Sequence, residues 1–386
     1  MMTNEERLHK TIRFEETDKI LSGPLIAQFA ATYAGMTQKD FADNPLKAEE
    51  AYDKTFTELG GWDVGRPFIA GAPGAGRGSG PVGFAMGTMR PGRELADDSV
   101  VQFVEHEVML PEDYDFVIEN GFNALQKRLN ERAAASNPPR VNPPIRSPEE
   151  QQRAAERDAE RVKATTAKWD ARDVVRLSSG NLALPPFDFF SIHRSVAKFP
   201  MDVRRMPDKI KAATKACMPD IIASAKKSAE TSGCRRVGTA SSRSSGTFIS
   251  NKQFEEFVLP TWLEFVWAMA DADLDVIFHC DCDWTRFLPY FKEFPAKRCV
   301  LQLDGATDIF KAKEVLKDHM ALHGDVPAPL LTLGTPEDVY AYCKKLIEEI
   351  GEGGGFILSS GCSTPSNSKI ENVRAMVRAG NELTWV

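Results

Sequence analysis

The chain has 386 residues and a formal net charge of −7, with 48 Lys and Arg against 55 Asp and Glu. Hydrophobic residues make up 42% and charged residues 27%, which excludes a disordered or collagen-like protein and suffices for one large core or two smaller ones. No basic stripe supplies the clustered Lys and Arg that bind phosphate backbones, so nucleic acid is not an expected partner.

The first residues, MMTNEERLHK, lack the apolar segment of a secretory signal, and no apolar run approaches the roughly 18 residues of a membrane-spanning helix. Seven cysteines, an odd number scattered over a long chain, indicate reduced thiols rather than a disulfide framework. These features predict a cytoplasmic protein without a membrane partner.

Two segments of the first half are too rich in glycine or proline for regular helix. Residues 71–92 predict a loop or lid that leads into a hairpin over 93–107, and the absence of a following Gly-Lys-Ser/Thr argues against a phosphate cradle. Residues 136–148 carry five prolines and predict a linker, followed by a charged surface helix over 149–168. We interpret this linker as an insertion within one domain.

The second half alternates short apolar runs with amphipathic helical patterns. The runs cover residues 274–281, 299–305, 320–326 and 355–362, and each has the length of a buried strand. Thr335 and Pro336 are typical of the start of a helix, with Gly351 beyond its end. Regular βα units of this kind predict an α/β fold, a (β/α)8 TIM barrel with an N-terminal extension and a glycine-rich insertion. A doubly wound sheet is the alternative.

Each of the four apolar runs ends in side chains that can do chemistry, and barrel enzymes place their active sites at the carboxyl ends of the strands. Because side chains alternate along a strand, His279 and Asp281 point to one face, while Cys280 and Cys282 point to the other. With Cys362 from a distant strand, they would form a three-ligand site with an open position, the pattern of catalytic zinc. A hydrogen-bonded histidine beside buried thiols is the structural alternative.

Other candidates carry weaker signals. Asp304 and Asp325 end two of the strands and are expected near the substrate. Phe187 and Phe189 could line a substrate pocket or fill the core, and His193 with its neighbour Arg194 could bind an anionic group or end a solvated helix. His319 and His323 are interpreted as surface groups or as groups behind a ligand.

Several stretches resemble the uroporphyrinogen decarboxylase superfamily. The carboxyl-terminal stretch GDVPAPLLTLGTPEDVYAYCKKLIEEIGEGGGFILSSGC, continuing into STPSNSKIENVRAMVRA, carries the resemblance, and GTFISNKQFEEFVLPTW extends it upstream. The early LIAQFAATYAGMTQKDFADNP, through GGWDV, is similar to the methyltransferase branch. The Arg-rich segment with which the decarboxylases hold porphyrinogen carboxylates is not found. The resemblance implies one barrel domain over 1–386, with N-terminal elaborations over about 1–130.

In the corrinoid-dependent methyltransferases of this superfamily, a His-Xaa-Cys pair and a later Cys bind zinc. The resemblance therefore implies zinc on His279 and Cys362, with Asp281 where the first Cys belongs and Cys280 or Cys282 as alternates. A carboxylate in place of a thiolate makes zinc a harder Lewis acid, which suits an oxygen substrate. These three residues would then be catalytic, and Phe187, Phe189, His193, Asp304 and Asp325 would contact the substrate.

The function implied is transfer of a methyl group from a methyl ether, such as a methoxylated aromatic, to cobalt(I) of a corrinoid on a partner protein. No Asp-Xaa-His-Xaa-Xaa-Gly motif of cobalamin-binding domains occurs in the chain, so the corrinoid would arrive on that partner. The alternatives are transfer from a methylcorrinoid to a thiol or folate acceptor, and a non-catalytic scaffold. A homodimer is one option for the assembly, and the sequence does not name the methyl donor.

Overall fold

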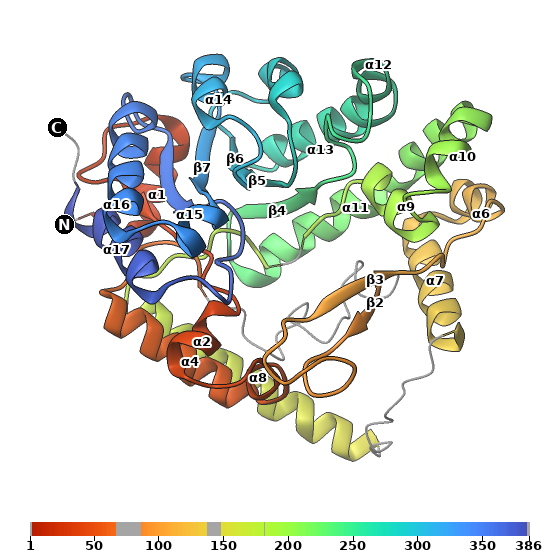
Figure 1. The fold of residues 1–386 in the computed structure, drawn as a ribbon. Helices are drawn as coiled ribbons and strands as arrows, with labels where there is room; N and C mark the ends of the chain where they lie inside the picture. Colours follow the sequence, from red (N-terminus) through yellow and green to blue (C-terminus); the bar gives the residue numbers. More distant parts are fainter. Residues whose placement is uncertain (1, 67–85, 137–147, 181, 384–386) are drawn as a thin grey trace.

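The fold was analysed in a computed structural model, which describes residues 2–66, 86–136, 148–180 and 182–383. Its central feature is a sheet of six parallel strands in the order β1-β8-β7-β6-β5-β4 (Figure 1). The strands are β1 Leu21–Ser22, β4 Arg236–Ser241, β5 Asp275–Cys280, β6 Cys299–Leu303, β7 Ala321–Val326 and β8 Phe356–Ser360. The four strands predicted in the second half are confirmed, and with them the α/β class.

The six strands do not close into a ring. Between β1 and β4 the hydrogen bonding passes through residues 63–65, 175–180 and 182–183, where Val64–Val175 and Leu182–Gly238 form single bridges. Two of the eight strands expected for a barrel are therefore not present as strands among the described residues. Gly61 and Gly65, both with positive φ, bound the first of these stretches, and a strand cannot extend through either turn.

Helices cover the outer face of the sheet (Figure 1). They include α11 Pro207–Ser232, α13 Leu259–Asp271, α14 Ile309–Leu316, α16 Pro336–Lys345 and α17 Ile370–Glu382. Thr335 caps α16 in a capping box with Asp338, and the π-helical turn η3 Leu346–Ile350 continues it to Gly351, as predicted. The main hydrophobic core lies between these helices and the sheet.

A second, smaller core fills the inner face of the sheet. Leu8 and Ile12 of α1 (Asn4–Arg13) pack there against residues near the start of the strands, among them Ile277 of β5 and Ile357 of β8. Helix α1 therefore covers the inner face at the amino ends of the strands. The inner face at their carboxyl ends is left for polar side chains.

The remaining elements surround this barrel-like unit. They are α2 Phe29–Ala34, α3 Gln38–Asp43, α4 Pro45–Leu59, α6 Asp113–Asn120, α7 Phe122–Ser136, α8 Pro148–Asp170, α9 Pro186–Arg194, α10 Phe199–Arg205, α12 Asn251–Gln253, α15 Ala328–Leu333 and the turns η1 Phe254–Val258 and η2 Thr285–Glu293. The surface helix predicted over 149–168 is α8. None of the described helices is long and apolar enough to cross a membrane.

An antiparallel hairpin of β2 Met86–Met89 and β3 Gln102–Glu105 lies apart from the sheet (Figure 1). A hairpin is present in this region as predicted, but it pairs 86–89 with 102–105 instead of lying within 93–107, so its first strand falls inside the glycine-rich segment that was predicted to be a loop. Pro91 and Gly92 fall in the turn region instead, because the preceding residues 86–89 pair with 102–105. Residues 67–85 and the proline-rich 137–147, predicted as loop and linker, lie outside the described residues.

Candidate active site

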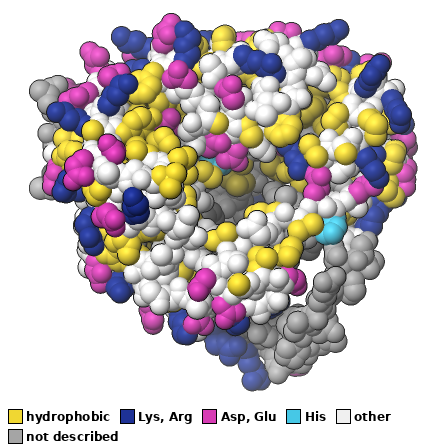
Figure 2. Space-filling model, in the orientation of Figure 1, with side chains coloured by type: hydrophobic (Ala, Val, Ile, Leu, Met, Phe, Trp, Pro, Cys, Tyr) yellow, Lys and Arg dark blue, Asp and Glu magenta, His cyan; other side chains and the backbone are white. Residues whose placement is uncertain are grey.

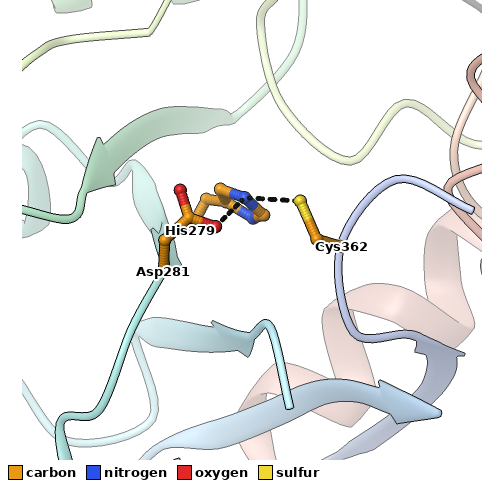
Figure 3. A group of neighbouring side chains, drawn as sticks. All are labelled: His279, Asp281 and Cys362. Carbon is orange, nitrogen blue, oxygen red and sulfur yellow. Dashed lines mark hydrogen bonds and ion pairs between the residues drawn. The ribbon is translucent and has the colours of Figure 1, made fainter. Parts of the chain in front are cut away.

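Three side chains that can bind a metal converge at the carboxyl ends of the strands (Figure 3). His279 Nε2 lies 3.2 Å from Asp281 Oδ1 and 3.6 Å from Cys362 Sγ. One ligand atom from each residue lies within 4.8 Å of the other two. The structure thus brings together the three residues that the sequence singled out, from the end of β5 and from the loop after β8.

The pleat of β5 places the first two of these residues. Ile277 lies in the inner core, His279 stands above it on the same face, and Cys280 is fully buried on the opposite face among the helices. The Asp281 N–H donates to the Ser241 carbonyl, which extends the pairing with β4 by one residue. Cys282 then has a positive φ, which ends the alternation. Neither alternate thiol belongs to the group of converging ligands.

Cys362 is held in place by the close approach of two loops. A Cβ on Gly361 would lie 2.6 Å from the carbonyl carbon of Asp304, so the loop after β8 can pack against this backbone only with glycine there. The Ser360 hydroxyl donates to the Cys362 carbonyl at 2.8 Å and accepts from the Leu25 N–H at 3.1 Å. The backbone that carries the thiol is therefore fixed from two sides.

Gln302 supports the imidazole from behind. It lies on β6 in register with His279, and its Oε1 is 2.9 Å from His279 Nδ1. A carbonyl oxygen only accepts, so Nδ1 carries the proton and Nε2 faces Asp281 and Cys362. The sequence analysis missed Gln302, although a lone polar residue inside the apolar strand CVLQL was a usable signal.

The electrostatics of the group favour a cation at Nε2. Burial of the imidazole lowers its pKa, but hydrogen bonds and charge interactions with Asp281 and Cys362 outweigh burial and raise the pKa of His279 to about 10. A proton is therefore held between a carboxylate and a sulfur atom. A metal ion that takes the place of this proton finds one nitrogen, one oxygen and one sulfur donor, a set that zinc accepts.

The two strand-end aspartates predicted near the substrate have structural partners. Asp304 accepts the N–H groups of Cys282 at 2.7 Å and Ala306 at 2.8 Å, and so shapes the loops beside the site. Asp325 is 3% exposed and accepts the Tyr342 hydroxyl of α16 at 3.0 Å. Burial raises the pKa of Asp325 to about 7. Asp325 therefore points to a covering helix rather than to the three converging ligands.

Phe187, Phe189 and His193 lie on α9, all nine residues of which are buried. The His193 ring stacks on Phe189 with centroids 3.8 Å apart, and its Nδ1 donates to the Phe189 carbonyl at 2.7 Å. Arg194 is paired with Asp202 and Glu107. The two phenylalanines are surrounded by other core side chains, which was the alternative to a substrate pocket. Arg194 lies in a buried ion-pair network and not at a solvated helix end.

A buried carboxylate that the sequence analysis did not single out organises the loop after β4. Asp188 accepts the Ser241 hydroxyl at 2.8 Å, the N–H groups of Ser242 and Arg243 at 3.0 and 2.9 Å, and the Ser244 hydroxyl. Arg243 in turn forms an ion pair with Glu105 of β3 at 2.6 Å. The hairpin is thereby connected to the carboxyl end of the sheet, where the ligand group lies.

The surface is hollowed near the centre of the face shown in Figure 2, with hydrophobic and acidic side chains along its rim. Two exposed hydrophobic residues, Phe103 and Val104, come from β3, and a third, Phe248, comes from the loop after β4. The Glu105–Arg243 ion pair links these two segments. Exposed hydrophobic side chains therefore lie on two segments, β3 and the loop after β4, beside the carboxyl ends of the strands.

Comparison with known proteins gives partial matches to two curated relatives. A uroporphyrinogen decarboxylase of Methylococcus capsulatus is 32% identical over 123 residues, 32% of this chain and 27% of that protein. One of Coxiella burnetii is 32% identical over 77 residues, 20% of this chain and 21% of that protein. The matched part thus spans about a quarter of the length of these relatives.

A solved structure matches over the whole length. A methyltransferase from Methanosarcina mazei superposes with a TM-score of 0.64, covers 99% of both chains and is 17% identical in sequence. At this identity the likeness shows a shared fold. The family model of uroporphyrinogen decarboxylase (URO-D) matches residues 132–383, which is more than half of the chain and includes all three converging ligands. The chain belongs to the uroporphyrinogen decarboxylase family.

Proposed function

We propose that this protein is a zinc-dependent methyltransferase that moves a methyl group from a methyl ether, such as a methoxylated aromatic, to the corrinoid of a partner protein. The observation that carries the proposal is the convergence of His279, Asp281 and Cys362 at the carboxyl ends of the strands. Membership of an enzyme family and the methyltransferase with the same fold support a catalytic role.

The donor set fits a catalytic zinc ion. The three ligand atoms lie within 4.8 Å of one another, and three protein ligands leave a position open for substrate. Gln302 holds the imidazole so that Nε2 is the atom available to metal. Zinc bound there would supply a Lewis acid that stabilises negative charge developing on the oxygen of the leaving group.

Asp281 is the residue that favours an oxygen substrate. A carboxylate donates less electron density than a thiolate, so a site with one sulfur donor is harder than a site with two. Its side chain is 40% exposed, so it can also adjust when a substrate enters. A harder zinc site favours cleavage of an ether over methylation of a thiol. Methylation of a thiol is the alternative reaction that the assay of methyl transfer can detect.

The methyl acceptor in this proposal is carried by a second protein. Residues 1–386 contain no Asp-Xaa-His-Xaa-Xaa-Gly motif for a corrinoid, so a second protein would bring the methyl acceptor to this site. The exposed Phe103, Val104 and Phe248 beside the strand ends are available for a transient contact with that protein. Activity of the chain by itself is not expected.

Metal analysis tests the site. Purified protein should contain about one zinc ion per chain, and Cys362→Ala should lose most of it, because one of three ligands is removed. Cys282→Ala is the matched control, since this nearby thiol does not belong to the converging group, and it should retain zinc. Full zinc content in Cys362→Ala would overturn the assignment of the ligands.

Methyl transfer tests the reaction. The isolated chain should not release phenol from methoxyaromatics, whereas addition of a reduced corrinoid protein from the same organism should give free phenol and the absorbance of a methylated corrinoid. Asp281→Cys should keep zinc but slow this reaction, because a second thiolate weakens the Lewis acid. Turnover without any corrinoid would refute the proposal, and faster methylation of a thiol than demethylation of an ether would favour the thiol acceptor.

A further inference from the structure

Three polar side chains occupy adjacent positions on neighbouring parallel strands. The register pairs His279 of β5 with Gln302 of β6, and Gln302 with His323 of β7. Residues paired in this way point to the same face of a sheet, with strands about 4.8 Å apart. Gln302 is therefore placed between the proposed zinc ligand and a second histidine.

His323 presents an acceptor to Gln302. It is 1% exposed, and burial lowers its pKa to about 4, so the ring is neutral and carries a single N–H. Its Nε2 lies 3.3 Å from the Gly23 carbonyl oxygen, which can only accept, so the proton is on Nε2. Nδ1 is then a bare lone pair, and it is buried without a hydrogen-bond partner.

Gln302 has the complementary unsatisfied group. It is 4% exposed, its Oε1 accepts from His279 Nδ1, and its Nε2 is buried without a partner. A buried donor and a buried acceptor without partners each destabilise the folded protein, and a bond between these two groups on neighbouring strands removes both costs. Rotation about the terminal torsion of the Gln302 amide is the movement that this bond requires, and such torsions are soft.

We propose that His323 is a positioning residue that fixes the tautomer of His279 through the amide of Gln302. The chain of donors runs in one direction: His279 Nδ1–H to Gln302 Oε1, Gln302 Nε2–H to His323 Nδ1, and His323 Nε2–H to the Gly23 carbonyl. If the Gln302 amide were flipped, its oxygen would face the lone pair of His323 Nδ1, and its NH2 group would face His279 Nδ1–H. Both contacts are unfavourable, because an acceptor then faces an acceptor and a donor faces a donor. His323 thereby excludes the orientation that would move the imidazole proton onto the metal-binding nitrogen.

A double-mutant cycle separates this role from simple packing. His323→Phe keeps a ring of similar size but no acceptor, so the Gln302 amide can flip, and we expect zinc affinity to fall by about tenfold or more, the usual cost of losing support behind a metal ligand. Gln302→Glu offers His279 an acceptor in either orientation. In that background, His323→Phe should change zinc affinity by less than about twofold, or raise it. An equal loss in both backgrounds would overturn the proposal.

Ser359→Ala is the matched control. The Ser359 hydroxyl donates at 2.8 Å to the same Gly23 carbonyl that accepts from His323, but no hydrogen bond joins Ser359 to Gln302. Its removal should lower the midpoint of unfolding without changing zinc affinity in a competition with a chromophoric chelator. A loss of affinity equal to that of His323→Phe would assign the effect to this carbonyl instead of to Gln302.

The inference uses the proposed zinc site only for the affinity measurement, and a second measurement needs no metal. In the metal-free protein, an NMR titration of His279 should give a lower pKa in His323→Phe than in the parent, since an NH2 group would then face Nδ1–H. An unchanged pKa refutes the positioning role even if zinc binds. A lowered pKa in a protein that binds no zinc keeps the positioning role and rejects the zinc proposal.

Discussion

Asp325 is a buried carboxylic acid whose replacement by asparagine should make the protein more stable above neutral pH. Its side chain is 3% exposed and accepts a hydrogen bond from the Tyr342 hydroxyl at 3.0 Å. Burial is the largest cause that raises its pKa, to about 7 from the usual 3.8, and the Tyr342 bond opposes it. An asparagine side chain at this position would keep an acceptor for Tyr342 and remove the charge.

The magnitude follows from linkage between protonation and folding. The folded protein binds this proton more tightly than the unfolded chain by about three pH units, and each unit corresponds to about 1.4 kcal/mol, so the ionised carboxylate costs about 4 kcal/mol at most. The cost is absent below about pH 4, where the acid is protonated in both states, grows between about pH 4 and pH 7, and is complete above about pH 7.

Denaturant unfolding at several pH values measures this effect. Asp325→Asn should match the parent at about pH 4 and exceed its free energy of unfolding by up to about 4 kcal/mol at about pH 8. Tyr342→Phe is the paired variant: loss of this donor should raise the pKa of Asp325 further, so the decline of the free energy of unfolding should continue to a higher pH than in the parent. If the asparagine variant is less stable than the parent at about pH 8, the carboxylate is stabilised in the folded protein and the argument from burial is wrong.

Three further predictions concern the site and the loops around it. Zinc affinity should rise at least about tenfold per pH unit up to about pH 9, because the metal displaces the His279 proton; a flat profile by chelator competition contradicts this. Gly361→Ala should lower zinc affinity, since its Cβ would displace the Asp304 backbone, while the exposed neighbour Ser363→Ala should not. Asp188→Asn should lower the free energy of unfolding by about 2–4 kcal/mol, because one amide oxygen cannot accept four donors, whereas Ser241→Ala should cost about 1 kcal/mol; a smaller loss for Asp188→Asn would be inconsistent with this network.

The strands of the second half could be predicted because each is a continuous apolar run between clear helix signals. The helix cap at Thr335 and the paired directions of Ile277 and His279 also follow from local pattern. The stretches at 63–65 and at 175–180 with 182–183 could not be identified in the same way. Their pairing is made by single bridges between residues far apart in sequence, and neither stretch has an apolar run of strand length.

The ligand group was within reach of sequence analysis for a similar reason. His279 and Asp281 share a face by the pleat of one strand, and Cys362 closely follows another strand of the same sheet. Gln302, His323 and Asp188 act through partners 20 or more residues away in the chain, so their roles required the register of β6 and β7 and the placement of α9. Asp325, which was predicted to contact the substrate, has a hydrogen-bond partner on the covering helix α16, and the end of a strand does not by itself predict such a partner.

On the inner face of the sheet, the residues that stabilise the fold and the residues at the proposed site occupy different positions along the same strands. Ile277, Val300 and Ala321 contact α1 and its apolar neighbours, and two residues later the same strands carry His279, Gln302 and His323. The lower layer can hold the fold without the upper one, so a substitution such as Asp281→Cys can change the hardness of a metal site while the core stays intact. Gln302 and His323 are the exception, because they are buried and also orient a ligand. Substitutions at these two positions should therefore affect both zinc affinity and the free energy of unfolding, whereas substitutions at Asp281 should affect the metal site and the reaction while the core stays intact.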